Sequence, residues 1–157
     1  MKPVLLFLLL VLFLAACSPA VKTQPVVSIP TETTPAPTQT VSEGPTRTDQ
    51  QGAVVVDVTP LNLDNPGQTL DFQVSMDTHS VDLSMDLAML ATLATDTGLQ
   101  VEPISWDGPR GGHHVSGTLS FPATADGKPL LAGASQLTLT IRSVDADSRI
   151  FTWSINP

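Results

Sequence analysis

The residues of this chain that are best suited to chemistry are three histidines in two short polar clusters. His79 lies in one cluster, beside Met76, and His113 and His114 follow a pair of glycines in the other. Imidazole is a good ligand for copper or zinc, and a thioether favours Cu(I). The pattern therefore predicts a candidate metal site formed by His79, His113, His114 and Met76.

Two features of the same residues favour a structural alternative. The histidines show no spacing that is typical of a metal motif. Successive residues of a strand also point to opposite faces. His113 and His114 can therefore share one ion only if the strand begins after them. In the alternative interpretation, the histidines hydrogen-bond to the backbone and hold loops in place, or they contribute to peptide recognition.

A catalytic site is a weaker hypothesis for this sequence. Ser80, His79 and Asp82 supply the residue types of a hydrolase triad, but neighbours in a strand do not face one another. The sequence has no nucleophile motif or phosphate-binding loop, and nothing in it indicates an oxyanion hole. We therefore expect the protein not to be an enzyme and to carry no resident cofactor.

The first residues indicate export and lipidation. Lys2 precedes an unbroken apolar run of thirteen residues, Val4–Ala16, whereas a membrane-spanning helix needs about 20. A run of this length is typical of a signal peptide. Its end, Leu14-Ala15-Ala16-Cys17, resembles the lipobox of bacterial lipoproteins. That resemblance implies cleavage after residue 16 and lipid on Cys17. Lipid there would anchor the protein to the cell membrane or outer membrane on the extracytoplasmic side, since two acyl chains already give stable anchoring.

The remaining sequence divides into a linker and a domain. Residues 18–50 contain six prolines and eight threonines without apolar periodicity, a composition that cannot bury enough apolar surface to fold. Residues 17–50 are therefore predicted to form a lipidated, disordered stalk, and residues 51–157 the folded domain. Because Cys17 is the only cysteine, the domain must be held together by a hydrophobic core and not by disulfides.

Charge and periodicity bound what this domain is. Residues 51–157 carry twelve acidic and four basic side chains, so nucleic acid and anionic lipid headgroups are poor partners. Apolar and polar residues alternate with the period of strands. They do so in seven segments: 53–58, 69–76, 81–87, 99–104, 115–121, 136–141 and 150–155. Turn residues separate most of these segments, including Asp126-Gly127.

Seven short strands in a domain of this length predict an all-β fold, an antiparallel immunoglobulin-like β-sandwich. One segment, residues 86–97, places Leu87, Leu90, Ala91 and Ala94 at helical spacing, and predicts one short helical crossover between the sheets. Met85 and Met89, on either side of its start, are expected to fill the core.

These features together predict a membrane-tethered extracytoplasmic lipoprotein. Its β-sandwich is expected to be a non-enzymatic binding domain for a protein or cell-envelope partner. The alternative is a lipoprotein that binds copper or zinc through His79, His113 and His114.

Overall fold

The computed structural model describes residues 45–155, so the predicted signal peptide, Cys17 and most of the predicted stalk lie outside the described residues. No helix within residues 45–155 is long and apolar enough to cross a membrane. The described chain is built from strands and a single turn of 3-10 helix. In chain order these are β1 (Arg47–Asp49), β2 (Val54–Pro60), β3 (Thr69–Thr78), η1 (Leu87–Met89), β4 (Ala91–Thr95), β5 (Gln100–Val101), β6 (Ser105–Trp106), β7 (His114–Pro122), β8 (Thr124–Ala125), β9 (Lys128–Pro129), β10 (Gln136–Arg142) and β11 (Ser148–Ser154).

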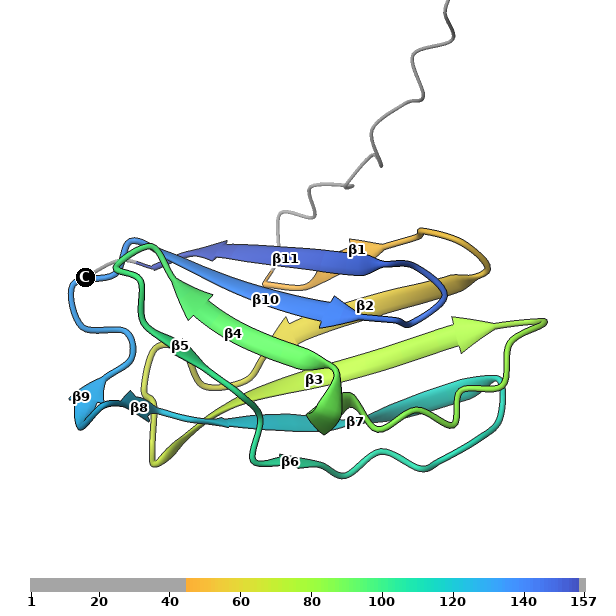
Figure 1. The fold of residues 1–157 in the computed structure, drawn as a ribbon, viewed down its shortest axis with the longest axis horizontal. Helices are drawn as coiled ribbons and strands as arrows, with labels where there is room; N and C mark the ends of the chain where they lie inside the picture. Colours follow the sequence, from red (N-terminus) through yellow and green to blue (C-terminus); the bar gives the residue numbers. More distant parts are fainter. Residues whose placement is uncertain (1–44, 156–157) are drawn as a thin grey trace, which may run out of the picture. The chain divides into compact units, whose positions relative to one another are not determined.

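The strands form an antiparallel β-sandwich (Figure 1). One sheet has the order β1-β2-β3-β7-β6, the other has the order β11-β10-β4-β5, and β8 pairs with β9 in a separate hairpin. Apart from the additional β1, the first sheet corresponds to strands A, B, E and D of an immunoglobulin domain, and the second to G, F and C with one further edge strand. The predicted immunoglobulin-like sandwich is confirmed.

The core lies between the two sheets and follows the predicted alternation. In β3, every second side chain from Leu70 to Met76 is buried, and the residues between them face outward. Three aromatic side chains connect the layers. Phe72 of β3 meets Phe121 of β7 edge to face, with ring centroids 5.7 Å apart, and Trp153 of β11 with centroids 5.4 Å apart. These contacts join the sheets in a domain whose described residues contain no cysteine.

The segment predicted to be helical is mostly a strand. Leu87–Met89 does form one helical turn, but Ala91–Thr95 forms β4 and pairs with β10. The alternation Ala91, Leu93, Thr95 is buried, and the threonines in it are β-branched and suit a strand. The helical spacing of Leu87, Leu90 and Ala91 therefore arises because a helical turn is followed directly by a strand, and it does not reflect one continuous helix.

Of two other predicted strands, one is absent and one is shorter than expected. Residues 81–87 bury Leu83 and Leu87 as the alternation predicted, but they form no strand. Only Leu83 has ladder-like bonds there: its amide donates to the Gly112 carbonyl at 3.0 Å and its carbonyl accepts from Gly111 at 3.0 Å. Of residues 99–104, only Gln100–Val101 is a strand, because the chain then crosses to the other sheet.

The folded domain begins earlier than the sequence predicted. Arg47–Asp49, assigned to the stalk, pairs with β2 as strand β1. Two further contacts hold this segment to β11: the Trp153 indole donates to the Pro45 carbonyl at 2.5 Å, and Arg47 donates to the Thr152 carbonyl at 3.0 Å. The boundary at residue 50 was therefore wrong, since residues 45–50 are part of the sandwich.

Candidate functional site

The two histidine clusters lie at the same end of the first sheet. His114 begins β7 and is paired in register with Asp77 near the end of β3. The Thr78 amide donates to the His113 carbonyl at 2.9 Å, which brings the chain around His79 beside the second cluster. All three histidines are exposed. The topology thus brings together backbone segments that are more than thirty residues apart in the sequence.

Met76, the fourth predicted ligand, does not belong to this cluster. Its side chain is 1% exposed and packs in the core, because it occupies an inward position of β3, where successive residues alternate between the two faces. Within residues 45–155, no three His, Cys, Asp or Glu side chains are placed to hold one metal ion. The predicted constellation of His79, His113, His114 and Met76 is therefore not assembled in the described part of the chain.

A carboxylate–imidazole pair occupies this end of the sheet instead. His114 Nδ1 lies 2.6 Å from Asp77 Oδ1, and both side chains are at least half exposed. Two residues along the same strands, the hydroxyls of Ser75 and Ser116 are 2.9 Å apart and belong to the same outward face. The sequence alone does not indicate the pair, because Asp77 and His114 are neighbours only through the register of β3 with β7.

Metal binding can be tested by thermal unfolding. Adding Zn(II) or Cu(II) at neutral pH should leave the melting temperature of the chain unchanged, since the described residues gather no three ligands. An assembled site at a hundredfold excess over Kd would add about 2.7 kcal/mol, and each kcal/mol raises the melting temperature by about 4–8 °C for a domain of this size.

The matched variant for this test is the double substitution His113→Ala/His114→Ala. It should melt with and without metal as the wild type does. A large stabilisation that is absent from this variant, and that fades below pH of about 6.5 as imidazoles become protonated, would contradict the expectation.

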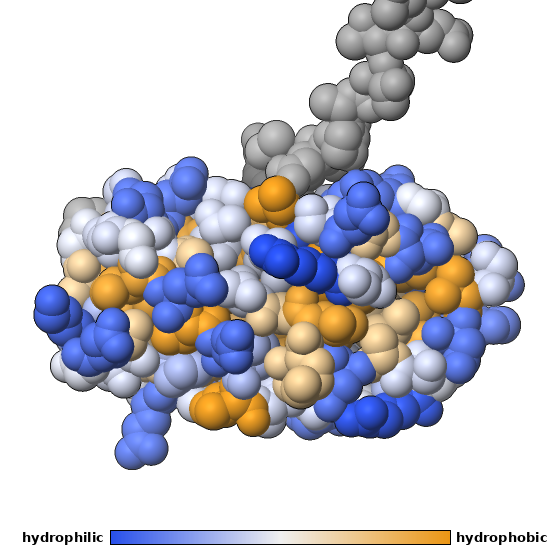
Figure 2. Space-filling model, viewed as in Figure 1, coloured by the Kyte–Doolittle hydropathy of each residue, from blue (hydrophilic) through white to orange (hydrophobic). Residues whose placement is uncertain are grey.

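A second candidate site is an exposed apolar patch on the side of the sandwich. Met89, in η1, is 81% exposed, and Ile104, just before β6, is 62% exposed. The turn η1 lies beside β6, and Met89 and Ile104 belong to these two adjacent segments. We call the exposed surface of Met89 and Ile104 the η1–β6 patch. In Figure 2, orange and tan atoms appear between blue polar groups along the lower edge, where Figure 1 places η1 and β6. Met89, expected in the core, is therefore at the surface.

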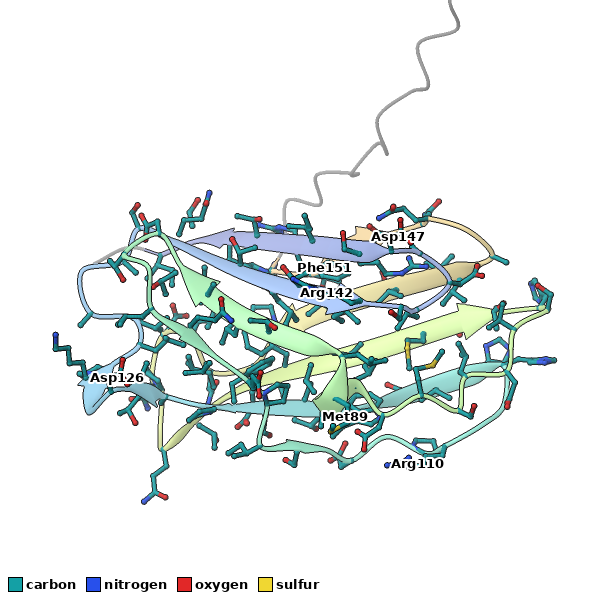
Figure 3. All side chains as sticks on the ribbon, in the orientation of Figure 1. Met89, Arg110, Asp126, Arg142, Asp147 and Phe151 are labelled. Atoms are coloured by element: carbon teal, nitrogen blue, oxygen red, sulfur yellow. The ribbon has the colours of Figure 1, made fainter. Side chains whose placement is uncertain are left out.

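The η1–β6 patch is held rigidly from beneath. Leu87 is buried and anchors the turn in the core. The Asp86 carboxylate caps the turn by accepting from the Ala88 amide at 3.1 Å. Its second oxygen lies 2.6 Å from Arg110, which belongs to the loop that follows β6; Figure 3 shows Met89 and Arg110 on the same side of the domain. These contacts fix the backbone that presents Met89 to solvent.

The edges of the sheets offer little for strand addition by a partner. β1 has three residues, and β5 and β6 have two each. The longer edge, β11, is covered by side chains, because Arg47 and Gln51 donate to its carbonyls at Thr152 and Ser148. Short or covered edges are how β proteins avoid unwanted pairing. Recognition through side chains is therefore more consistent with this surface than pairing of strands.

A shallow hollow of about 790 Å³ lies where residues 45–47 meet the end of β11 and the turn after β2. Its lining mixes apolar Leu61 and Ile155 with polar Arg47 and Asn62. Two of these polar groups are already engaged in holding the fold, since Arg47 bonds the Thr152 carbonyl and Asn62 bonds the Thr69 carbonyl. Asp64, Asn65 and Ser154 complete its polar lining.

Comparisons with known proteins place no function on these sites. No family model matches the chain, and no curated protein matches it significantly. Among solved structures it is similar to a DUF4426 family protein from Pseudomonas aeruginosa PAO1. The identity is 9%, the match covers 72% of this chain and 96% of that chain, and the TM-score is 0.39. A likeness at this level does not indicate a shared function, so the function has to be inferred from the residues of this chain.

Proposed function

We propose that this chain is a lipid-anchored extracytoplasmic protein whose β-sandwich is a binding domain without a catalytic role. In this proposal, lipid on Cys17 attaches the protein to the cell membrane or outer membrane, and the residues that follow separate the domain from the lipid surface. The sandwich then binds a protein or another component of the cell envelope.

The observation that carries the binding role is the η1–β6 patch. Large apolar side chains that are scattered singly over a surface need no explanation, whereas larger exposed apolar patches, especially those rimmed by polar residues, mark interaction sites. Met89 and Ile104 are the two most exposed large apolar side chains of the described residues, and they lie on adjacent segments. The turn that presents Met89 is capped by Asp86 and anchored by Leu87. Methionine is also common at surfaces that bind proteins, because its flexible thioether adapts to its partner.

The supports for the anchor are the lipobox-like residues Leu14-Ala15-Ala16-Cys17 and the apolar run before them. The fold is compatible with such a tether, because the chain enters the sandwich through residues 45–49, which are bonded to β11. A pull on the preceding chain would therefore be transmitted to hydrogen bonds at the edge of the sandwich.

The anchor is tested by the substitution Cys17→Ser. The wild type should incorporate labelled palmitate. It should also partition into the detergent phase of a phase-separating detergent, because burial of each methylene of the acyl chains contributes about 0.8 kcal/mol to membrane binding. The variant should incorporate no palmitate and should be left unprocessed or move to the aqueous phase. Ser18→Ala, a substitution at the next residue, is the matched control and should behave as the wild type. Equal palmitate labelling of the wild type and the Cys17→Ser variant would refute the anchor.

A further inference from the structure

We infer that the η1–β6 patch docks a protein whose surface has an apolar centre and a rim of lysines and arginines. This inference rests on the proposed binding role and deepens it by naming the site and the chemistry of the partner. It combines three properties of the patch: apolar exposure, a rigid support and a rim of negative charge.

The apolar centre consists of Met89 and Ile104, which are 81% and 62% exposed. Burial of apolar surface contributes roughly 25 cal/mol per Å², so two large side chains already give a useful anchor. Residues that dominate an interface lie near its centre, in contacts from which water is excluded. The patch is small, and it therefore suits a transient interface rather than a permanent one.

The support beneath the patch reduces the entropic cost of docking. Around Met89, the amide of Met89 donates to the Asp86 carbonyl at 3.1 Å, and the next carbonyl, that of Leu90, accepts from Arg142 at 2.9 Å. The turn is thus bonded to the start of its own segment and to the end of β10. A partner would have to order the Met89 side chain alone and not the backbone, which preserves binding free energy.

The rim sets the chemistry of the partner. The segments that form the patch, and the loops next to them, carry four carboxylates and one cation, Arg110, which is paired with Asp86. The four carboxylates belong to Asp82, Asp86, Glu102 and Asp107. A second cation, Arg142, ends β10, and its amide donates to the Leu90 carbonyl next to Met89. Acidic side chains around the patch therefore outnumber basic ones by four to two. Complementary charge steers association and suppresses wrong partners. A surface with lysines or arginines around an apolar centre therefore fits, whereas an acidic surface or an anionic membrane is repelled.

The same rim argues against a second copy of this chain as the occupant. Most homodimers have two-fold symmetry, in which the same patch meets itself. Docking of the η1–β6 patch on its own copy would place the acidic rims against each other. Like charges at an interface are costly, so a partner of opposite charge is favoured.

The test uses the full chain in nanodiscs of zwitterionic lipid, with its methionine and isoleucine methyl groups labelled for NMR. The probes are two peptides with the same Leu-Trp-Leu centre, one flanked on each side by three lysines and the other by three glutamates. The lysine peptide should shift the methyl signals of Met89 and Ile104 at peptide concentrations about tenfold lower than the glutamate peptide. Because the reporters are local, peptide that binds the lipid does not imitate the result.

Internal and matched controls accompany the titration. The methyl of Ile150, which is 46% exposed on β11 away from the patch, should not shift. Met89→Gln/Ile104→Gln should weaken the lysine peptide about tenfold or more, as followed by its tryptophan fluorescence, whereas Ile150→Gln should not. Raising the salt from about 0.05 to about 0.5 M should weaken binding, because it screens the rim.

Three outcomes would overturn the inference. These are equal shifts with both peptides, no shift with either, and shifts of Met89 and Ile104 that depend on the concentration of the chain itself, which would identify a second copy as the occupant. The Cys17→Ser experiment is independent of this titration. If Cys17→Ser behaves as the wild type but the lysine peptide still binds at the patch, only the tether is refuted. If the anchor is confirmed but the peptide does not bind there, only the docking surface is refuted.

Discussion

A chain that begins at Gln51 should lose about 3–5 kcal/mol of folding free energy relative to one that begins at Pro35, because truncation removes Asp49 and leaves a buried cation unpaired. Arg149 is fully buried, and its guanidinium lies 2.5 Å from the Asp49 carboxylate. A domain of this size is typically stable by about 5–15 kcal/mol in total. The shorter chain should therefore be partly or wholly unfolded at 37 °C.

The reason for so large an effect is the number of bonds that Arg149 makes. Its Nε–H donates to the Val144 carbonyl at 2.9 Å, and one terminal nitrogen donates to the Gln51 carbonyl at 2.7 Å. The other terminal nitrogen donates to both the carboxylate and the carbonyl of Asp49. Burial lowers the pKa of Arg149, and the nearby carboxylates of Asp49 and Asp145 oppose this shift. Without Asp49, the cation keeps its desolvation cost and loses its main compensation.

Single substitutions separate the ion pair from the rest of strand β1. Asp49→Asn should cost about 3–5 kcal/mol in urea unfolding. Arg149→Met should cost at least as much, because it leaves the buried Asp49 carboxylate without its cation and removes a donor from three backbone carbonyls. Asp147→Asn removes an exposed carboxylate from the adjoining turn and is the control; it should change stability by less than about 0.5 kcal/mol. Wild-type stability in Asp49→Asn would show that the pair does not hold β1 in place.

The same ion pair explains why the start of the domain could not be predicted. Proline and threonine around residues 45–49 resemble the composition of the stalk, and three residues are too few to show an alternation. β1 is ordered by Arg149, which lies 100 residues away in the sequence. Such a partner is a property of the tertiary fold, and local composition does not contain it.

Periodicity was sufficient where a strand is long and buried on one face. β2, β3, β7, β10 and β11 were predicted, because each shows at least three alternations between a buried and a less buried position. The turn at Asp126-Gly127 was also predicted, and both residues adopt positive φ, as a tight hairpin turn requires.

The candidate sites were harder to predict than the strands. The proximity of the two histidine clusters depends on the register of β3 with β7, and the alternation within each strand does not contain that register. Met89 is exposed because η1 ends at this residue and β4 already starts at Ala91. A continuous helix there would have turned Met89 differently, so the wrong secondary structure concealed the η1–β6 patch.

A second large effect is expected in the aromatic part of the core. Phe72→Ala and Trp153→Ala should each lower the free energy of unfolding by about 3–5 kcal/mol. Both side chains are buried, and they belong to opposite sheets, so each deletion opens a cavity between the layers. Trp153→Ala also removes the indole N–H that donates to the Pro45 carbonyl. Trp153→Phe, which keeps a ring but lacks that donor, should therefore still be less stable than the wild type.

The direct contact between these two rings predicts how the substitutions combine. Their centroids are 5.4 Å apart, and aromatic pairs of this kind contribute about 0.5–1.5 kcal/mol beyond the area that they bury. The double variant Phe72→Ala/Trp153→Ala should therefore cost less than the sum of the single ones by about that amount. Phe72→Ala combined with Ile150→Ala, whose side chain is half exposed on the outer face of β11, should be additive. Strict additivity in the first pair would mean that Phe72 and Trp153 do not join the sheets, because each would then pack independently within its own layer.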